Sequence, residues 1–302
     1  MAPNPASVRA GLLAVLGAAF IWGLMPLYLR LLHDVPVFEL LAWRILFSVP
    51  AAGIGVWIMR EQAGLPLVFK PKLLAILAFS ACLVATNWGV YVWAVQNGHV
   101  LQASLGYFLN PLINVALGVL LLGERLSAPR AVAVALAGAG VAMQALGVGA
   151  LPWITLTLAF SWGFYTLVRR QAAAPPALGL FVETLLLAPF ALLALQHFAA
   201  QAPLAFEGAD TRLRLLIACA GAVTATPLVL FAFGAKRLTL ATLGFMQYIA
   251  PTMQFFVGLF LGEPFTPLYA ASFALIWAGL AVFSWQAWRE SGWHQAKRST
   301  NG

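Results

Sequence analysis

Charged residues are scarce in this sequence. Lysine, arginine, aspartate and glutamate together make up 9% of its 302 residues, whereas hydrophobic residues make up 62%, and the mean hydropathy is +0.90. A soluble domain carries about 25% charged residues, because water must hydrate its surface. The scarcity of charge therefore excludes a soluble globular protein and indicates that hydrocarbon surrounds most of the side chains.

Cysteines and catalytic motifs are also few. Cys82 and Cys219 lie in apolar segments without CxxC spacing, so neither a metal site nor redox chemistry is indicated. The chain has no HExxH motif, no clustered Ser-His-Asp set and no phosphate-binding loop of the GxxxxGKS or GxxxxGKT type. We therefore expect no enzymatic activity, no metal and no cofactor. The basic residues form no patch with interleaved aromatics, so nucleic acid is not an expected partner.

Long apolar runs, by contrast, fill the chain. About 20 predominantly apolar residues suffice to cross a bilayer. Each run must be helical, because lipid offers no partner for free backbone groups and none of the runs alternates like a barrel strand. Ten such runs are predicted to span the membrane: residues 9–31, 38–59, 72–96, 101–122, 129–148, 151–169, 178–199, 213–235, 240–261 and 266–288.

The basic residues predict the orientation of these spans. With ten spans both termini share a side, and if that side is the cytoplasm, thirteen Lys and Arg residues lie inside. Only Arg30, Arg212 and Arg214 then lie in outer loops. The positive-inside rule therefore places both termini in the cytoplasm. Residues 1–8 form a cytoplasmic N-terminal tail, and residues 289–302 form a second cytoplasmic tail that we expect to be disordered.

The chain repeats itself at an offset of about 140 positions. The string AFIWG at 19–23 returns as AFSWG at 159–163, and ASLG at 103–106 returns as ATLG at 241–244. Each copy holds five spans, an odd number, so the second copy must enter the membrane the other way up. The sequence thus predicts an all-α polytopic membrane protein with two inverted five-helix repeats, residues 9–148 and 151–288. Inverted repeats are typical of secondary transporters.

The repeated strings also resemble a known family. Phe-x-Trp-Gly in each first span and Leu-Gly…Pro…Gly-Glu in each fourth span are similar to EamA-type permeases of the drug/metabolite transporter superfamily. The strings QASLGYFLNPLINVALGVLLLGER and LATLGFMQYIAPTMQFFVGLFLGE resemble its RarD branch, whose members are often labelled chloramphenicol-sensitivity proteins. The resemblance covers residues 8–288 and implies a multi-pass permease of the bacterial inner membrane. It implies no particular substrate.

Two charged residues lie inside predicted spans. Arg44 is in the second span and Glu183 in the seventh, 139 positions apart, so they are equivalent positions of the two repeats. A charge within a bilayer is costly and usually functional. We expect both to face a polar central cavity, where they either pair directly or bind opposite ends of a polar substrate. The alternative is that each lies near an interface and snorkels.

Amide and hydroxyl side chains recur on helical faces of the third, fourth and ninth spans. They either line the cavity or form hydrogen bonds between helices. The candidates for cavity lining or substrate binding are Asn87, Trp88, Tyr91, Tyr107, Asn110, Asn114, Gln247 and Tyr248, together with Arg44 and Glu183.

Prolines within or near the spans are candidate hinges, although simple kinks would use the same residues. The hinge candidates are Pro26, Pro111, Pro227 and Pro251. Glu124 and Glu263 each follow a glycine at the end of a span, and we expect them to cap or to form salt bridges rather than to couple ions.

These observations together predict a secondary active permease that works by alternating access around a cavity between the repeats. By resemblance its mode is efflux of small polar or amphipathic metabolites or drugs, with Glu183 as the candidate proton carrier. The expected partners are a small-molecule substrate of unknown identity and the lipid bilayer, with protons and a second copy of the chain left open. A passive channel or facilitator, or a membrane scaffold, is the alternative.

Overall fold

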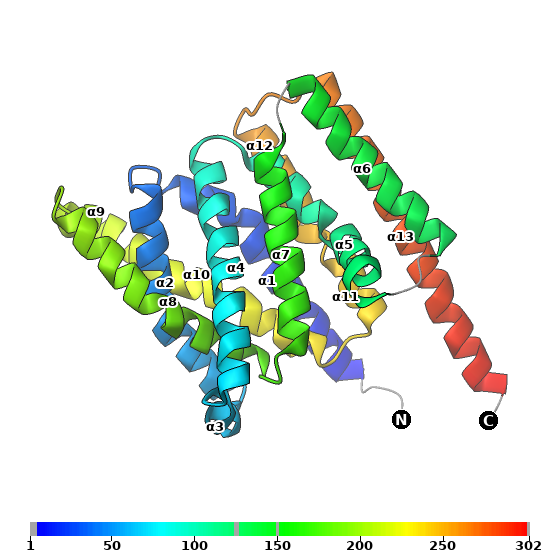
Figure 1. Cartoon of the computed structure of the whole chain (residues 1–302), viewed down its shortest axis with the longest axis horizontal. Coiled ribbons are helices and arrows are strands. Elements are labelled where there is room, and N and C mark those ends of the chain that lie inside the picture. The colour runs from blue at the N-terminus through cyan, green and yellow to red at the C-terminus, as the bar shows by residue number, and fades with distance from the viewer. Residues whose placement is uncertain (1–4, 124–126, 149–150, 301–302) are drawn as a thin grey trace.

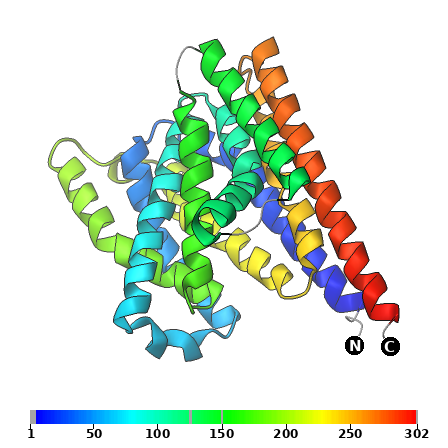
Figure 2. The ribbon, with the colours of Figure 1, turned by 45° about the vertical axis from the view of Figure 1, so that its right-hand side comes forward.

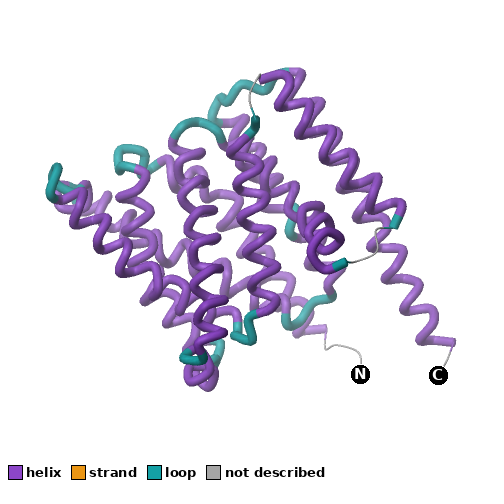
Figure 3. Tube along the Cα trace, in the orientation of Figure 1, coloured by secondary structure: helices purple, strands orange, loops and turns teal. Residues whose placement is uncertain are grey.

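The computed structural model describes residues 5–123, 127–148 and 151–300, which form helices joined by short loops, without any strand (Figure 3). The long helices are α1 (Pro5–Arg30), α2 (Val37–Ile58), α4 (Pro71–Gln96), α5 (Val100–Leu122), α6 (Ala128–Val148), α7 (Trp153–Gln171), α8 (Pro176–Ala199), α10 (Thr211–Ala235), α12 (Ile249–Phe260) and α13 (Pro267–Thr300). The shorter helices are η1 (Gln62–Gly64), α3 (Leu65–Val68), α9 (Ala205–Gly208) and α11 (Leu240–Met246).

In the described residues, 9 helical segments are long and apolar enough to cross a membrane. The chain is therefore an all-helical, multi-pass membrane protein. The segment missing from the ten predicted is α7, which has 19 residues but carries several hydroxyl side chains and ends in Arg169 and Arg170. α7 packs along α4 and α5 (Figure 1), so protein rather than lipid surrounds much of it. This contact explains how α7 tolerates more polar residues than its neighbours.

Both ends of the described chain lie at the same end of the molecule (Figure 1). The start of α1 and the end of α13 are found at the end that also carries α3, whereas α9 lies at the opposite end. This arrangement agrees with termini on one side of the membrane. The last helix continues to Thr300, so residues 289–300, which we expected to be disordered, are helical.

The helices pack in pairs that bring together distant parts of the sequence. α6 and α13 lie side by side along one edge of the molecule (Figure 2), and α2 packs against α8. α1 contacts α10 and α12, while α7 contacts α4 and α5. Most of these large contacts join the first half of the chain to the second, so the interior of the molecule is made by both.

Two close helix crossings use glycines from the repeated Phe-x-Trp-Gly string. A Cβ on Gly23 of α1 would lie 2.6 Å from the Cβ of Met253 in α12, and a Cβ on Gly163 of α7 would lie 2.6 Å from Cγ2 of Ile113 in α5. Gly23 and Gly163 are 140 positions apart, as are Ile113 and Met253. The glycine of this string is needed because it lets two helices approach.

The α6–α13 pair shows the same relation. A Cβ on Gly140 would lie 2.9 Å from the carbonyl oxygen of Ser272, and a Cβ on Gly279 would lie 2.7 Å from that of Ala133. The two glycines are 139 positions apart, and so are Ala133 and Ser272. The positions through which α6 contacts α13 are therefore equivalent, at an offset of 139, to those through which α13 contacts α6.

Candidate functional site

A buried arginine lies between the two halves of the chain. Arg44 of α2 is 5% exposed, and its Nε donates a hydrogen bond of 2.7 Å to the Thr224 hydroxyl of α10. The guanidinium carbon lies 4.8 Å from the centroid of the Trp88 ring, a cation–π contact. Nη1 is buried without a hydrogen-bond partner. Within the described residues no carboxylate forms an ion pair with Arg44.

Hydroxyl and amide groups of α4 and α5 surround this arginine. The Tyr107 hydroxyl donates to Oδ1 of Asn87 at 3.0 Å, and Nδ2 of Asn87 donates to the Ser161 hydroxyl of α7 at 3.0 Å. The Tyr91 and Tyr107 rings lie 5.6 Å apart, and both side chains interact electrostatically with Arg44. The Tyr91 hydroxyl is buried without a partner.

The structure therefore gathers five of the predicted site residues. We name this group the Arg44 cluster, and it consists of Arg44, Asn87, Trp88, Tyr91, Tyr107 and Thr224. Its members come from α2, α4, α5 and α10, which include helices of both halves of the chain. Arg44 does not snorkel to solvent, because its side chain is enclosed by protein.

Glu183 lies in a second buried group. Its side chain is 0% exposed. The Ser80 hydroxyl of α4 donates to Oε1, and the Tyr165 hydroxyl of α7 donates to Oε2 at 3.2 Å. Nε of Arg169 lies 3.5 Å from Oε1, with the Arg169 side chain 14% exposed. We name Ser80, Tyr165, Arg169 and Glu183 the Glu183 cluster.

The direct pairing of Arg44 with Glu183, one of the two expected arrangements, is not found in the described residues. Glu183 takes its cation, Arg169, from α7, near the end of that helix and of the predicted span 151–169. Gly179, one turn before Glu183 on α8, makes the pairing possible, because a Cβ there would overlap the Arg169 guanidinium. Among the described residues, none supplies a counter-charge to Arg44.

The two clusters lie toward opposite ends of the molecule. Arg44 and Glu183 are each the eighth residue of their helices, about 10 Å from the helix start at 1.5 Å per residue. α3 follows α2, α9 follows α8, and these two short helices lie at opposite ends of the molecule (Figure 1). α2 and α8 therefore run in opposite directions, and each cluster lies nearer to a different membrane face.

Other predicted residues lie apart from these clusters. Asn114 and Gln247 are exposed. Asn110 is half-buried, and its Oδ1 has no partner. The Tyr248 ring, between α11 and α12, stacks at 6.4 Å on Phe108 of α5. Cavity lining by these four residues stays a prediction.

The four prolines differ in their effect on the helices. α1, α5 and α10 continue through Pro26, Pro111 and Pro227. The helix is interrupted at Gln247 and Tyr248, between α11 and α12, and α12 begins at Ile249, two residues before Pro251. Pro251 has no N–H to donate to the carbonyl group four residues earlier, and its ring would clash with that carbonyl. The ninth predicted span is thus discontinuous, while the hinge role of all four prolines stays a prediction.

Glu263 caps a helix of the other half of the chain. Its Oε1 accepts a hydrogen bond from the Val100 N–H at 2.6 Å and its Oε2 accepts one from Leu101 at 2.8 Å. These are the first amides of α5, where a carboxylate also benefits from the helix dipole. Burial raises the pKa of the Glu263 carboxyl, while the two amides and Arg30 act in the opposite direction. The predicted capping role is confirmed, whereas Glu124 lies outside the described residues.

A second cap, which we did not predict, lies at the opposite end of the molecule. Oε2 of Glu61 accepts hydrogen bonds from the Ala177 N–H at 2.9 Å and from Leu178 at 3.0 Å, at the start of α8. Nζ of Lys236 lies 3.6 Å from its Oε1. Glu61 follows Arg60, whose φ of 56° ends the preceding helix. An acidic residue just after a span is the signal that could have suggested this cap.

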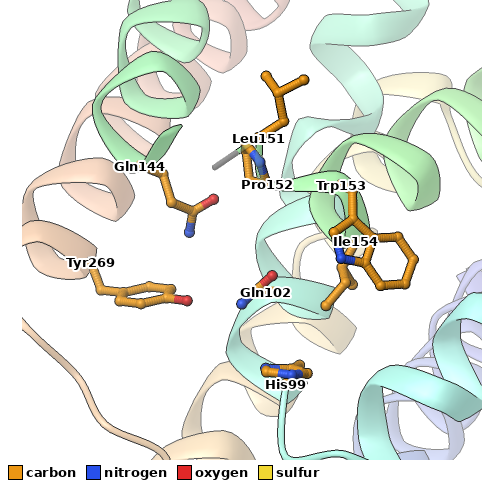
Figure 4. A pocket seen from close by; sticks show the side chains of 8 residues that line it. All are labelled: His99, Gln102, Gln144, Leu151, Pro152, Trp153, Ile154 and Tyr269. Carbon is orange, nitrogen blue, oxygen red and sulfur yellow. The ribbon is translucent and has the colours of Figure 1, made fainter. Parts of the chain in front are cut away.

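A cavity of about 160 Å³ lies where α5, α6, α7 and α13 meet. Gln144 is 1% exposed, and neither its amide nitrogen nor its amide oxygen has a partner. Figure 4 shows Gln144 and Tyr269 pointing toward Gln102 in this cavity. His99 also lines it, stacked at 5.6 Å on Trp93, and burial lowers the pKa of its imidazole. His99 is thus partly buried.

Known proteins identify the family. Residues 9–146 match the EamA-like transporter family. An uncharacterized transporter of Pseudomonas aeruginosa is 44% identical over 293 residues, covering 94% of this chain and 96% of that protein. Protein RarD of Escherichia coli is 42% identical over 277 residues, covering 91% and 94%. The chain belongs to the RarD branch of the EamA family. The resemblance found in its repeated strings is thereby confirmed.

A solved structure agrees with the fold. Its title names only the crystal structure of a protein, and it is 20% identical to this chain. The superposition covers 95% of this chain and 99% of the solved chain, with a TM-score of 0.56. At this identity the likeness concerns the fold alone. Its near-complete coverage of both chains shows that the similarity extends over the EamA-type transporter as a whole.

In this EamA-type transporter, the sequence predicted Arg44, Glu183 and the aromatic residues near Arg44, but not the hydrogen-bond and ion-pair partners Thr224, Ser80, Tyr165 and Arg169. Arg169 is the last residue of its predicted span, and Ser80 and Thr224 are small hydroxyl residues of a kind found in many helices. The spacing of Tyr165 and Arg169, four residues apart on one helical face, is the available signal.

Proposed function

We propose that this chain is a secondary active permease that exports small polar or amphipathic metabolites by alternating access. One observation carries the proposal, namely that charged side chains are buried at contacts between the two halves of the chain. Arg44 of the first half binds Thr224 of the second, and Glu183 of the second half binds Ser80 of the first. A relative movement of the halves would open both clusters, because each has members on both sides.

The same proposal includes ten spans in two inverted five-helix repeats, with α7 as the tenth. The polar groups of α7 have partners inside the protein, since Thr155 donates to the Gln102 carbonyl at 2.9 Å and Arg169 pairs with Glu183. The paired glycine contacts, at constant offsets of 139 and 140 positions, support a pseudo-twofold axis in the membrane plane. Such an axis interconverts outward-open and inward-open states.

Proton coupling would act through Glu183. Protonation of its carboxylate would remove the charge that holds Arg169, and the α7–α8 contact would then loosen. Deprotonation would restore the ion pair. Such proton coupling requires a carboxylate whose cationic partner can move away. Arg169 meets this requirement, because it is near the end of α7, where its side chain can extend toward solvent.

Placement in the bacterial inner membrane with both termini in the cytoplasm is also part of the proposal. The positive-inside distribution supports it. Fusion of a reporter that is active only in the cytoplasm to the end of α13, and of one active only outside to the α8–α10 loop, tests it. Activity of both reporters is expected, and the reverse pattern would refute the orientation.

The test of transport compares cells that overproduce the wild type, Glu183→Gln or Glu207→Gln with cells that carry an empty vector. Glu207 is exposed in α9 and serves as the matched control. Untargeted mass spectrometry of cells and medium, with and without added chloramphenicol, should show a solute enriched in the medium of the wild type and of Glu207→Gln alone. If no solute differed although the protein was inserted and folded, the export proposal would fail.

A further inference from the structure

Arg44 is a permanent cation that lacks a counter-ion in the part of the chain that the structure describes. Its guanidinium keeps its charge in proteins, its side chain is 5% exposed, and no described carboxylate pairs with it. Burying a charge without a partner is strongly unfavourable, and more so within a bilayer. Glu183 shows how this chain otherwise treats such a charge, because a cation and two hydroxyl groups surround it.

The hydrogen-bonding groups at Arg44 do not compensate for the missing anion. The Thr224 hydroxyl accepts from Nε but donates its own hydrogen to the Ala220 carbonyl at 2.8 Å. Trp88 offers only the face of its ring. Nη1 of Arg44 and the hydroxyl of Tyr91 are both buried without a partner. Within the part of the chain that the structure describes, the site therefore holds two unused hydrogen-bond donor groups and an uncompensated positive charge.

We propose that the solute carried by this permease is a monocarboxylate with an apolar or aromatic body, and that its carboxylate binds Nη1 of Arg44 and the Tyr91 hydroxyl. This inference rests on the proposed function. Two carboxylate oxygens match two unused donors. A single negative charge neutralises the single cation, whereas a phosphate dianion would leave a buried excess of negative charge.

The aromatic rings near Nη1 of Arg44 and the Tyr91 hydroxyl indicate what the rest of the solute should be. Trp88 lies against the guanidinium, and the Tyr91 and Tyr107 rings are 5.6 Å apart. Asn87 and Tyr107 already bond to each other, and Asn87 also bonds to Ser161, so these groups do not call for further polar atoms on the solute. An aromatic or branched aliphatic body would pack against these faces.

The experiment measures binding to the purified full chain in lipid nanodiscs. The probes are acetate, butyrate, benzoate, 3-phenylpropionate and indole-3-acetate, each beside its neutral amide, together with phenylphosphonate. We expect at least one of the three aromatic acids to bind at least about 30-fold more tightly than its own amide, because only the acid pairs with the buried cation. Phenylphosphonate should bind more weakly than benzoate.

Variants assign this preference to the cluster. Arg44→Gln should remove the difference between acid and amide, Arg44→Lys should keep part of it, and Tyr91→Phe should weaken the acid alone. Arg212→Gln, at an exposed residue of α10, is the matched control and should bind like the wild type. If Arg44→Gln does not fold, the comparison of each acid with its amide in the wild type, and the reduced preference of Arg44→Lys, still test the inference.

Either of two results would overturn the inference. One is that no acid of the panel binds more tightly than its amide, and the other is that Arg44→Gln keeps the preference for acids. Failure of the proposed function would look different. Export of solutes that lack a carboxylate, in a Glu183-dependent manner, would refute the monocarboxylate proposal and support the permease function. Binding of acids at Arg44 without any transport would support the carboxylate site and refute the permease function.

Discussion

Loss of Arg169 should strongly destabilise the protein, and loss of Glu183 in the same molecule should largely restore stability. Arg169→Leu leaves a carboxylate that is 0% exposed with only the Ser80 and Tyr165 hydroxyls as donors. At 3.5 Å separation and an effective dielectric constant of about 20, the attraction between the two charges is about 5 kcal/mol before desolvation is counted. Removing one partner of a buried pair costs about 3–5 kcal/mol, so we expect a loss near 3 kcal/mol.

Glu183→Gln alone should cost less, about 1–2 kcal/mol, because Arg169 lies near the end of α7 and its side chain can extend toward solvent. In the double variant no unpaired charge remains. Its loss of stability should therefore fall at least about 2 kcal/mol short of the sum of the two single losses.

The assay is reversible unfolding in mixed detergent micelles by sodium dodecyl sulfate, followed by tryptophan fluorescence. Arg170→Leu is the matched control, since Arg170 is adjacent but exposed. The reasoning would be refuted if the two single losses added to within about 0.5 kcal/mol. It would also be refuted if Arg170→Leu cost as much as Arg169→Leu.

Further substitutions test the glycine contacts and the Glu263 cap, with the same unfolding assay. Gly163→Ala should cost about 1–2 kcal/mol because its Cβ would meet Ile113; Ile113→Ala should relieve that loss, and Gly138→Ala, with open space around it, should be neutral or stabilising. Gly179→Ala should displace the Arg169 guanidinium, so its cost should disappear in an Arg169→Leu background, and an undiminished cost there would contradict the overlap. Glu263→Gln should cost about 1–2 kcal/mol, since an amide oxygen replaces only one of the two acceptors. Burial raises the pKa of the Glu263 carboxyl above 4.5, so the folded protein binds this proton more tightly than the unfolded chain does. The stability linked to that proton is present below pH 4.5 and lost as the pH rises through the folded-state pKa, whereas the two amide hydrogen bonds remain. Wild-type stability should therefore fall over that window, and Glu263→Gln should lack this slope.

The apolar runs determined which parts of the chain are helical, because in lipid each segment must satisfy its own backbone. Residues 151–169 were also predicted as a helix, and α7 is one, but its hydroxyls and terminal arginines lower its hydropathy below that of a lipid-facing span. Only its packing against α4 and α5 shows where these polar groups are accommodated. In the same way, Pro251 indicated a hinge or a kink, and the structure decided that α11 and α12 are separate helices.

By itself the sequence determined the all-helical membrane class, the family and the two charged residues inside predicted spans, Arg44 and Glu183. Each of these follows from local composition or from a repeated string, which is readable without knowing how helices are turned toward one another. The partners of those charges were decided by tertiary structure alone. Whether Glu183 meets Arg44 or Arg169 depends on the rotation and depth of three packed helices. That geometry is set by side-chain packing such as Gly179 beneath the Arg169 guanidinium, which no local pattern encodes.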